Sequence, residues 1–187
     1  GRNLQFLFDQ YVLRGGHPDY KVSYSWDGDS KLAKVTVLQT QAKEGASGSE
    51  SGLFDLKIPI GFGYVKAAEG KRKNSTSAVE LKTMTIRVHE REQSFYFPLE
   101  EKPAFVSFDV GNHFLKTVTL DYSVVELKAQ ILHDPDPIPR IYAAEALAQK
   151  GGLEVVNTLI QVLQSDSLWG VRAEVAEQLA TIKLDQA

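Results

Sequence analysis

The chain has 187 residues, of which 43% are apolar and 24% charged, so it can form one large globular domain or two small ones. It contains no Cys, which excludes disulfides and thiolate metal sites, and its four His are well separated. The formal net charge of −3 argues against a broadly basic nucleic-acid surface, and no apolar run approaches the ~18 residues of a membrane span. We therefore expect a cytoplasmic protein without nucleic-acid or membrane partners.

The composition changes near residue 120, which predicts a multidomain β + α chain. Residues 1–120 carry 16 basic and 14 acidic side chains, whereas residues 121–187 carry 5 and 10. The apolar period also changes there, from two residues to about 3.6. We expect a terminal helix within residues 1–16, a β domain over 17–120 and helical repeats over 121–187.

The terminal helix is predicted from Leu4, Leu7, Phe8 and Tyr11, which share one helix face, and Gly15-Gly16 ends it. Six to eight short strands with no helix between them follow, which predicts an Ig-like antiparallel β-sandwich or a closed sheet. Alternating apolar residues mark these strands at 35–40, 54–60, 79–88, 95–99, 106–110 and 114–120.

Three local features of the β region make specific predictions. Pro59 cannot donate a ladder hydrogen bond, so its strand is expected at a sheet edge. The apolar phase shifts within 79–88, which predicts a bulge near 82–83. A short charged segment within 79–99 predicts a hairpin, and Asp27-Gly28-Asp29 predicts a turn between two strands.

The helical region repeats itself with a shift of 32 residues. This shift superposes Asp134 on Asp166 and Arg140 on Arg172. We therefore predict two short HEAT-like repeats of about 32 residues each. The Asp is expected to cap the second helix of its repeat, and the Arg to pair with the Asp of the neighbouring repeat and so fix the stacking.

The side chains that these repeats bury can also be predicted. Ser123 and Glu126 form a capping box at the start of the first helix. Val156, Leu159, Ile160 and Leu163 follow the spacing of a buried helix face. Trp169, in the second repeat turn, is a candidate contact residue, although we favour its packing against the neighbouring helix pair.

Residues with the right chemistry for catalysis or metal binding are sparse. His89-Glu90-Arg91-Glu92-Gln93 resembles the zinc motif H-E-x-x-H, but Gln93 replaces the second His and the segment does not have a helical pattern. The sequence has no nucleophile elbow and no phosphate-binding loop. We therefore assign no catalytic or metal-binding residue to this chain.

Several segments, in order, resemble the zinc aminopeptidases of the aminopeptidase N family. The segment FDQYVLRGGHP at 8–18 is similar to the one that closes the catalytic domain in that family, with Tyr11 in place of the usual Trp. YKVSYSW at 20–26 and VTVLQTQ at 35–41 resemble the first strands of the sandwich that follows, and NHFLK at 112–116 resembles a later strand. HDPD at 133–136 resembles the entry into the helical region. The motif residues are Phe8, Tyr11, Gly16, His17 and Pro18.

This resemblance implies the non-catalytic, C-terminal part of a zinc metallo-aminopeptidase. The sandwich would be a spacer and the repeats a lid, and the partners would be the upstream catalytic domain of the same chain and the peptides that it cleaves. Zinc is expected in the parent protein and no cofactor in this fragment, because the family's H-E-x-x-H, distal Glu and G-x-M-E-N motifs are absent here. The helix within 1–16 would remain from the catalytic domain.

Two other hypotheses remain. In the first, the parent resembles a transcription-initiation subunit that has an aminopeptidase-like layout. The chain would then belong to a catalytically dead scaffold that binds proteins through its HEAT-repeat surface. A carbohydrate-binding sandwich would need aromatic side chains aligned on an exposed sheet face, whereas most aromatics here fall on apolar faces.

Overall fold

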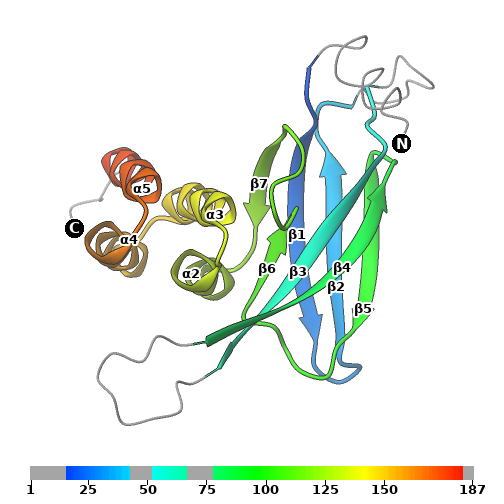
Figure 1. Cartoon of the computed structure of the whole chain (residues 1–187), viewed down its shortest axis with the longest axis horizontal. Helices are drawn as coiled ribbons and strands as arrows, with labels where there is room; N and C mark the ends of the chain where they lie inside the picture. Colours follow the sequence, from blue (N-terminus) through cyan, green and yellow to red (C-terminus); the bar gives the residue numbers. More distant parts are fainter. Residues whose placement is uncertain (1–15, 43–51, 67–77, 183–187) are drawn as a thin grey trace.

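A computed structural model describes residues 16–42, 52–66 and 78–182. Two β-sheets are followed by four helices, and the helices lie beside the sheets next to β6 and β7 (Figure 1). The predicted fold class, a β domain followed by a helical array, is confirmed. The helix predicted within residues 1–16 lies outside the described residues except for Gly16.

The first sheet has four strands in the order β5-β2-β1-β7. β1 pairs antiparallel with β2, and β2 pairs antiparallel with β5. β7 pairs parallel with β1. The predicted sandwich was antiparallel throughout, and this one pair of strands departs from it. The strand bounds are β1 Asp19–Asp27, β2 Leu32–Gln39, β5 Glu92–Pro98 and β7 Thr117–Asp121.

The second sheet has three antiparallel strands in the order β4-β3-β6, with bounds Ala78–Val88, Leu56–Lys66 and Phe105–Phe108. The two sheets pack face to face. Phe62 of β3 meets Phe97 of β5 edge to face with ring centroids 4.9 Å apart, and Tyr20 of β1 meets Phe108 of β6 at 5.3 Å. Aromatic rings from both sheets thus fill the centre of the sandwich.

The strand that contains Pro59 is central, so the prediction of an edge strand is wrong. Pro59 pairs with Thr85 of β4, and its carbonyl accepts a hydrogen bond from Val110 N at 3.1 Å on the β6 side. In an antiparallel ladder the nitrogen of a residue faces the same neighbour as its carbonyl. The part of β3 that pairs with β6 begins at Ile60, and Pro59 lies just before it, so the missing N–H removes no ladder bond.

The predicted bulge near 82–83 is also wrong, because β4 pairs with β3 without interruption from Ala78 to Val88. The two apolar sets of β4 lie on opposite faces of the strand. On the outer face, Leu81 covers Gly61: a Cβ built on Gly61 would meet Leu81 Cγ at 2.9 Å. Because Gly61 has no side chain, the apolar Leu81 of β4 can pack on the outer face of the sheet. This packing accounts for the change of apolar phase within β4 without a bulge.

The predicted hairpin over 79–99 is wrong as well, since β4 and β5 belong to different sheets. The charged turn after β4 carries the chain across the sandwich to pair with β2. The turn predicted at Asp27 is confirmed: the Asp27 Oδ1 accepts hydrogen bonds from Asp29 N at 3.0 Å and Ser30 N at 3.4 Å, between β1 and β2.

The four helices form two antiparallel pairs. Their bounds are α2 Val124–His133, α3 Pro137–Lys150, α4 Leu153–Ser165 and α5 Trp169–Thr181. Ser123 caps α2 as predicted, accepting from Glu126 N, whereas Glu126 pairs instead with Lys102 of the sandwich. None of the described helices has the length and apolar content needed to cross a lipid bilayer.

The buried face of α4 is rotated by about one residue from the prediction. Leu159 is fully buried as expected, but Ile160 is 39% exposed, and Val155 and Val162 are buried in its place. Val155, Leu159 and Val162 also follow the i, i+4, i+7 spacing. Both sets satisfy the sequence pattern, and contact with the neighbouring helices decides which one is covered.

This rotation makes a stability prediction. Leu159→Ala should lower the free energy of unfolding by about 2–5 kcal/mol, because it leaves a cavity in a fully covered position. Ile160→Ala, the matched control one residue away, should cost about 1 kcal/mol or less. Urea unfolding followed by circular dichroism measures both, and equal losses would show that the buried face is not the one described.

Candidate functional site

The carboxylates of Asp134 and Asp166 occupy equivalent turns of the two repeats. Asp134 Oδ1 accepts a hydrogen bond from Asp136 N at 3.0 Å, and Asp166 Oδ1 accepts one from Leu168 N at 2.9 Å. In both cases the donor is two residues further along, so the carboxylate closes the turn between paired helices. We call Asp134 and Asp166 the turn carboxylates.

The turn carboxylates do not cap the second helices, which corrects that part of the prediction. The N-cap of α3 is Asp136, whose side chain accepts from Ile138 N at 3.0 Å, and the N-cap of α5 is Leu168, which has no side-chain cap bond. Each turn carboxylate precedes the N-cap by two residues. The 32-residue shift thus correctly locates each Asp in its turn. The helix that follows begins after a separate N-cap residue, so the Asp stabilises the turn and does not cap the helix.

An ion pair joins the two repeats. Arg140 of α3 donates from Nη1 to Asp166 Oδ2 at 2.6 Å, and the two side chains are only 13% and 4% exposed. Arg172 of α5 donates from Nη1 to the backbone carbonyl of Asp166 at 2.7 Å. Asp166 therefore lies between the two repeat arginines, one from each repeat.

No cation among the described residues pairs with Asp134. Its Oδ2 accepts from Gln130 Nε2 at 3.2 Å, and the same amide nitrogen donates to Val106 O of β6 at 3.1 Å. Burial raises the pKa of Asp134, with hydrogen bonds from its neutral neighbours opposing the shift. The turn carboxylate of the first repeat is thus held by neutral donors, whereas that of the second repeat is held by a cation.

The loop before β7 provides a second link between sandwich and helices. Lys116 Nζ pairs with Asp109, and the two side chains are 1% and 0% exposed. Lys116 also donates to Asn112 Oδ1 at 2.9 Å, and Gly111 N donates to the Asp136 side chain at 3.3 Å. Residues 112–116, which resemble a strand in sequence, therefore form a loop that holds a buried cation and contacts the start of α3.

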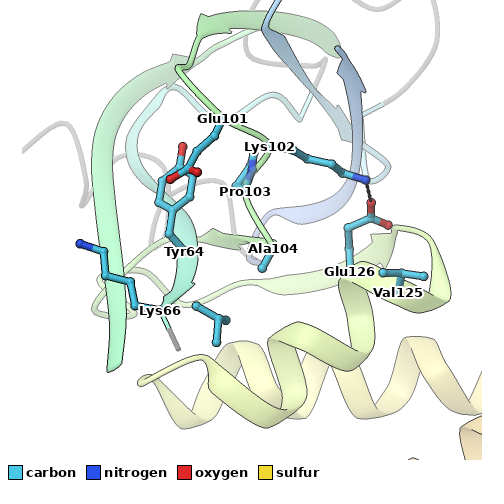
Figure 2. Close-up of a pocket in the computed structure, with 9 residues that line it drawn as sticks. Tyr64, Lys66, Glu101, Lys102, Pro103, Ala104, Val125 and Glu126 are labelled. Carbon is cyan, nitrogen blue, oxygen red and sulfur yellow. Dashed lines mark ion pairs between the residues drawn. The ribbon is translucent and has the colours of Figure 1, made fainter. Parts of the chain in front are cut away.

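A pocket of about 370 Å³ lies between the sandwich and α2 (Figure 2). Lys102 crosses from the sandwich loop to Glu126 of α2 at 3.0 Å, and Lys66 pairs with Glu80 of β4. The lining cations are thus neutralised by neighbouring carboxylates. The pocket lies where the sandwich meets the helices, and Tyr64 and Glu101 also line it.

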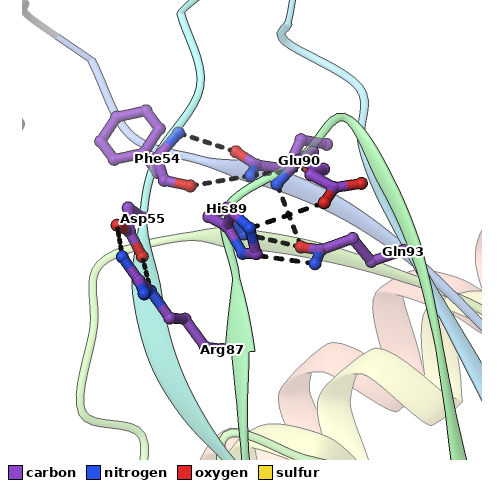
Figure 3. A network of polar contacts seen from close by, with 7 residues as sticks. Phe54, Asp55, Arg87, His89, Glu90 and Gln93 are labelled. Carbon is purple, nitrogen blue, oxygen red and sulfur yellow. Dashed lines mark hydrogen bonds and ion pairs between the residues drawn. The ribbon is translucent and has the colours of Figure 1, made fainter.

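The segment that resembles a zinc motif is a tight turn (Figure 3). Gln93 Oε1 accepts from His89 N at 2.7 Å and Glu90 N at 3.0 Å, so the residue that replaces the second His closes the turn between β4 and β5. Beside it, Arg87 holds Asp55 with two hydrogen bonds of 2.8 and 2.6 Å, which lowers the pKa of Asp55.

The described residues do not fit a zinc site, since no three His, Cys, Asp or Glu side chains among them are grouped so that they could hold a metal ion.

Gln39 is an important residue whose role the sequence did not reveal. Its side chain is fully buried, donates to Phe54 O at 2.8 Å and accepts from Phe54 N at 2.9 Å. The amide also donates to Glu90 O at 3.2 Å. Gln39 therefore joins β2 to the segment that leads into β3 and to the turn between β4 and β5. The signal for it was a polar residue that continues the apolar face of Ala33, Val35 and Val37.

The structure places the remaining candidate residues as follows. Phe8 and Tyr11 lie outside the described residues. Gly16 has φ of +98°, and His17 Nε2 lies 2.9 Å from Thr117 Oγ1 at the start of β7. Pro18 is buried, and its carbonyl accepts from Thr117 N at 3.0 Å.

Trp169 is 76% exposed, so the interpretation that we favoured, packing against a neighbouring helix pair, is wrong within the described residues. The adjacent Leu168 is 42% exposed. Both side chains lie at the start of α5, where the turn carboxylate Asp166 is already engaged by Arg140. The exposed indole is therefore a candidate contact with another molecule or another part of the parent protein.

Comparison with known proteins gives two findings. Residues 124–187 match the family of HEAT repeats. The chain is also similar in structure to Legionella pneumophila aminopeptidase A, solved in complex with aspartic acid, with a TM-score of 0.54 and 17% identity. The match covers 86% of this chain and 18% of that one, so this chain spans less than a fifth of the Legionella enzyme. No curated protein sequence matches.

The turn carboxylates should respond differently to neutralisation. Asp166→Asn leaves the Arg140 cation buried without its partner, so the free energy of unfolding should fall by about 3–5 kcal/mol. Asp134→Asn, the matched control, neutralises a carboxylate that pairs with no described cation; it keeps the oxygen that accepts from Asp136 N and loses the neutral hydrogen bond from Gln130. It should cost far less.

The pH dependence of Asp134 has a defined sign. Its pKa in the folded state is raised, so the contribution of the protonated group is fully present below the unfolded pKa of about 3.9 and lost as pH rises through the folded value. Stability measured by urea unfolding from pH 4 to 7 should therefore shift in favour of Asp134→Asn relative to the wild type. A shift in favour of the wild type would contradict this.

The buried cation of the loop gives another prediction. Lys116→Met removes the buried cation from the Asp109 carboxylate and leaves it with His113 Nδ1 and Phe114 N, each at 3.3 Å, which should cost about 3–5 kcal/mol in urea unfolding. Lys21→Met, which removes the exposed ion pair with Asp121, should change stability by less than about 1 kcal/mol. Similar effects of the two substitutions would show that Lys116 is not a buried partner.

Proposed function

We propose that this chain is a non-catalytic, C-terminal portion of a zinc aminopeptidase-like protein, in which it acts as a structural spacer and lid. The reaction of the parent would be the hydrolysis of N-terminal peptide bonds by an upstream catalytic domain. Partners would be that domain and peptides on their way to it. The setting that we propose is the cytoplasm.

The observation that carries the proposal is the combined order of the two parts of the fold. A β-sandwich followed directly by HEAT-like helices is similar to a portion of an aminopeptidase over 86% of this chain. The sequence segments at 8–18, 35–41 and 133–136 resemble that family in the same order. At 17% identity the structural likeness supports the fold, and the sequence segments supply the link to the activity.

The residues of this chain would contribute rigidity. The Lys102–Glu126 pair and the Gln130 amide hold the first repeat against the sandwich, and the Arg140–Asp166 pair holds the second repeat against the first. A lid needs this property, because a surface that restricts access to a site must keep its position. In the parent protein, zinc would activate the attacking water and polarise the peptide carbonyl.

An assay of the isolated chain tests the proposal. We expect no release of a fluorophore from aminoacyl coumarin amides by the 187 residues, with or without added zinc. Metal-dependent turnover that survives repurification, and that falls in His89→Ala, would overturn the assignment to a non-catalytic portion.

The coding sequence upstream of Gly1 is the second test. An H-E-x-x-H with a distal Glu there would support the proposal.

A scaffold function is the alternative, and the exposure of Trp169 and Leu168 favours it. A catalytically dead parent could use this edge of the repeats to bind a protein partner. An upstream sequence that has the aminopeptidase layout but lacks the zinc ligands would support the scaffold over the enzyme.

A further inference from the structure

A stripe of polar side chains lies on α2 where the helix meets the sandwich. Glu126, Gln130 and the C-cap Asp134 follow one another at intervals of four residues, so they lie on one face. All three are buried. We call these three residues the α2 stripe. Because buried polar groups are stable only with hydrogen-bond partners, each donor and acceptor along this stripe needs a partner.

The amide oxygen of Gln130 has no donor. The amide nitrogen donates to Val106 O at 3.1 Å and to Asp134 Oδ2 at 3.2 Å. The carbonyl of Val106 can only accept, which fixes the orientation of the amide, since a flipped side chain would place oxygen against oxygen. The Oε1 atom of Gln130 is buried and has no hydrogen-bond partner within residues 16–42, 52–66 and 78–182.

Two phenol hydroxyls close to the α2 stripe have the same deficit. Tyr24 of β1 and Tyr122, which precedes α2, pack edge to face with ring centroids 6.2 Å apart. Each Oη is shielded from solvent and has no hydrogen-bond partner in the described part of the chain. Burial raises the pKa of both phenols, and the nearby carboxylate of Glu126 adds to the shift at Tyr24. Both hydroxyls therefore keep their protons and have a hydrogen to donate.

We propose that ordered water binds in the joint between α2 and the sandwich, where it accepts hydrogen bonds from the hydroxyls of Tyr24 and Tyr122 and donates to Gln130 Oε1. The hydroxyls supply donors and the amide oxygen an acceptor, and water pairs with both kinds of group. A buried water makes about three hydrogen bonds to polar groups of this kind. This hydration site depends on the fold alone and holds whether or not the parent is a peptidase.

A metal cation would fit the site less well. It would bind the oxygen atoms but leave the phenol hydrogens without acceptors. It would also find no free carboxylate beside them, because Glu126 pairs with Lys102 at 3.0 Å. Asp134 is engaged by Gln130 and by Asp136 N. A cation buried without a counter-charge is strongly disfavoured, whereas neutral water satisfies the same atoms.

The pocket between the sandwich and α2 gives water a route to the site (Figure 2). Glu126 lines this pocket and is also the first residue of the α2 stripe. Its carboxylate lies close enough to Tyr24 to affect the pKa of that phenol. The α2 stripe thus begins at the pocket, and we expect its water to exchange with solvent through this end.

A high-resolution crystal structure of the 187-residue chain tests the site directly. We expect an ordered water within hydrogen-bond distance of Gln130 Oε1 and of at least one of the two phenol hydroxyls. A joint without water, in which these atoms pair with one another or stay unpaired, would overturn the proposal. A metal ion or an organic molecule in the same place would also overturn it.

Tyr122→Phe gives a test whose sign separates a hydrated hydroxyl from a dry one. Removing a hydroxyl that has no partner relieves a buried unsatisfied group and raises the urea midpoint, whereas removing one that is bound to water lowers it. We expect the midpoint to fall. Tyr96→Phe, on the exposed face of β5, is the matched control and should leave the midpoint unchanged. An unchanged or raised midpoint for Tyr122→Phe would overturn the proposal.

Magnetic relaxation dispersion of the water signal detects long-lived internal water in solution. We expect a clear dispersion from the wild type and a smaller amplitude from the double variant Tyr24→Phe, Tyr122→Phe, with circular dichroism to verify that the variant is folded. Equal amplitudes from the two proteins would overturn the proposal. The crystal structure of the wild type decides the question if the double variant does not fold.

Discussion

The placement of the helices depends on how a carboxylate in a buried turn is satisfied. A carboxylate removed from water needs a cation or several hydrogen-bond donors close by. Asp166 has Arg140 at 2.6 Å, and this requirement fixes the second repeat relative to the first. Asp134 has the amide of Gln130, whose nitrogen also reaches β6, and this fixes the first repeat relative to the sandwich. The same turn geometry therefore serves two different interfaces.

The junction between the two parts combines a continuous apolar core with a buried polar network. Asp109, Lys116, Gln130 and Asp134 all have buried side chains there, and they come from the sandwich, the loop before β7 and α2. Such a network contributes orientation more than net stability, since much of the attraction between buried charges offsets their lost hydration.

The sequence predicted the fold class because each part has its own period. Alternation marked the strands, and the shift of 32 residues marked the repeats and brought Arg140 and Asp166 to notice. The sequence wrongly predicted an edge strand at Pro59, because a residue pattern does not show how far the neighbouring strand β6 extends.

The remaining errors have a common physical cause. Two sets of apolar residues on α4 are equally regular in sequence: Val156 with Ile160, and Val155 with Val162. Only contact with the neighbouring helices decides which set is buried. The roles of Gln39 and Lys116 depend on partners 15 and 7 residues away across turns, which no helix or strand period encodes.

The parallel pairing of β1 with β7 has a consequence for how the chain folds. The two strands meet through Asp19 and Thr117, 98 residues apart, and β7 leads directly into α2. During synthesis from the N-terminus, β1 keeps one open edge until β7 has emerged. The closure of the sheet therefore waits for the segment that also begins the helical array, and this late contact of high sequence separation is entropically costly. The completion of the first sheet and the start of the helical array therefore depend on the same segment of the chain.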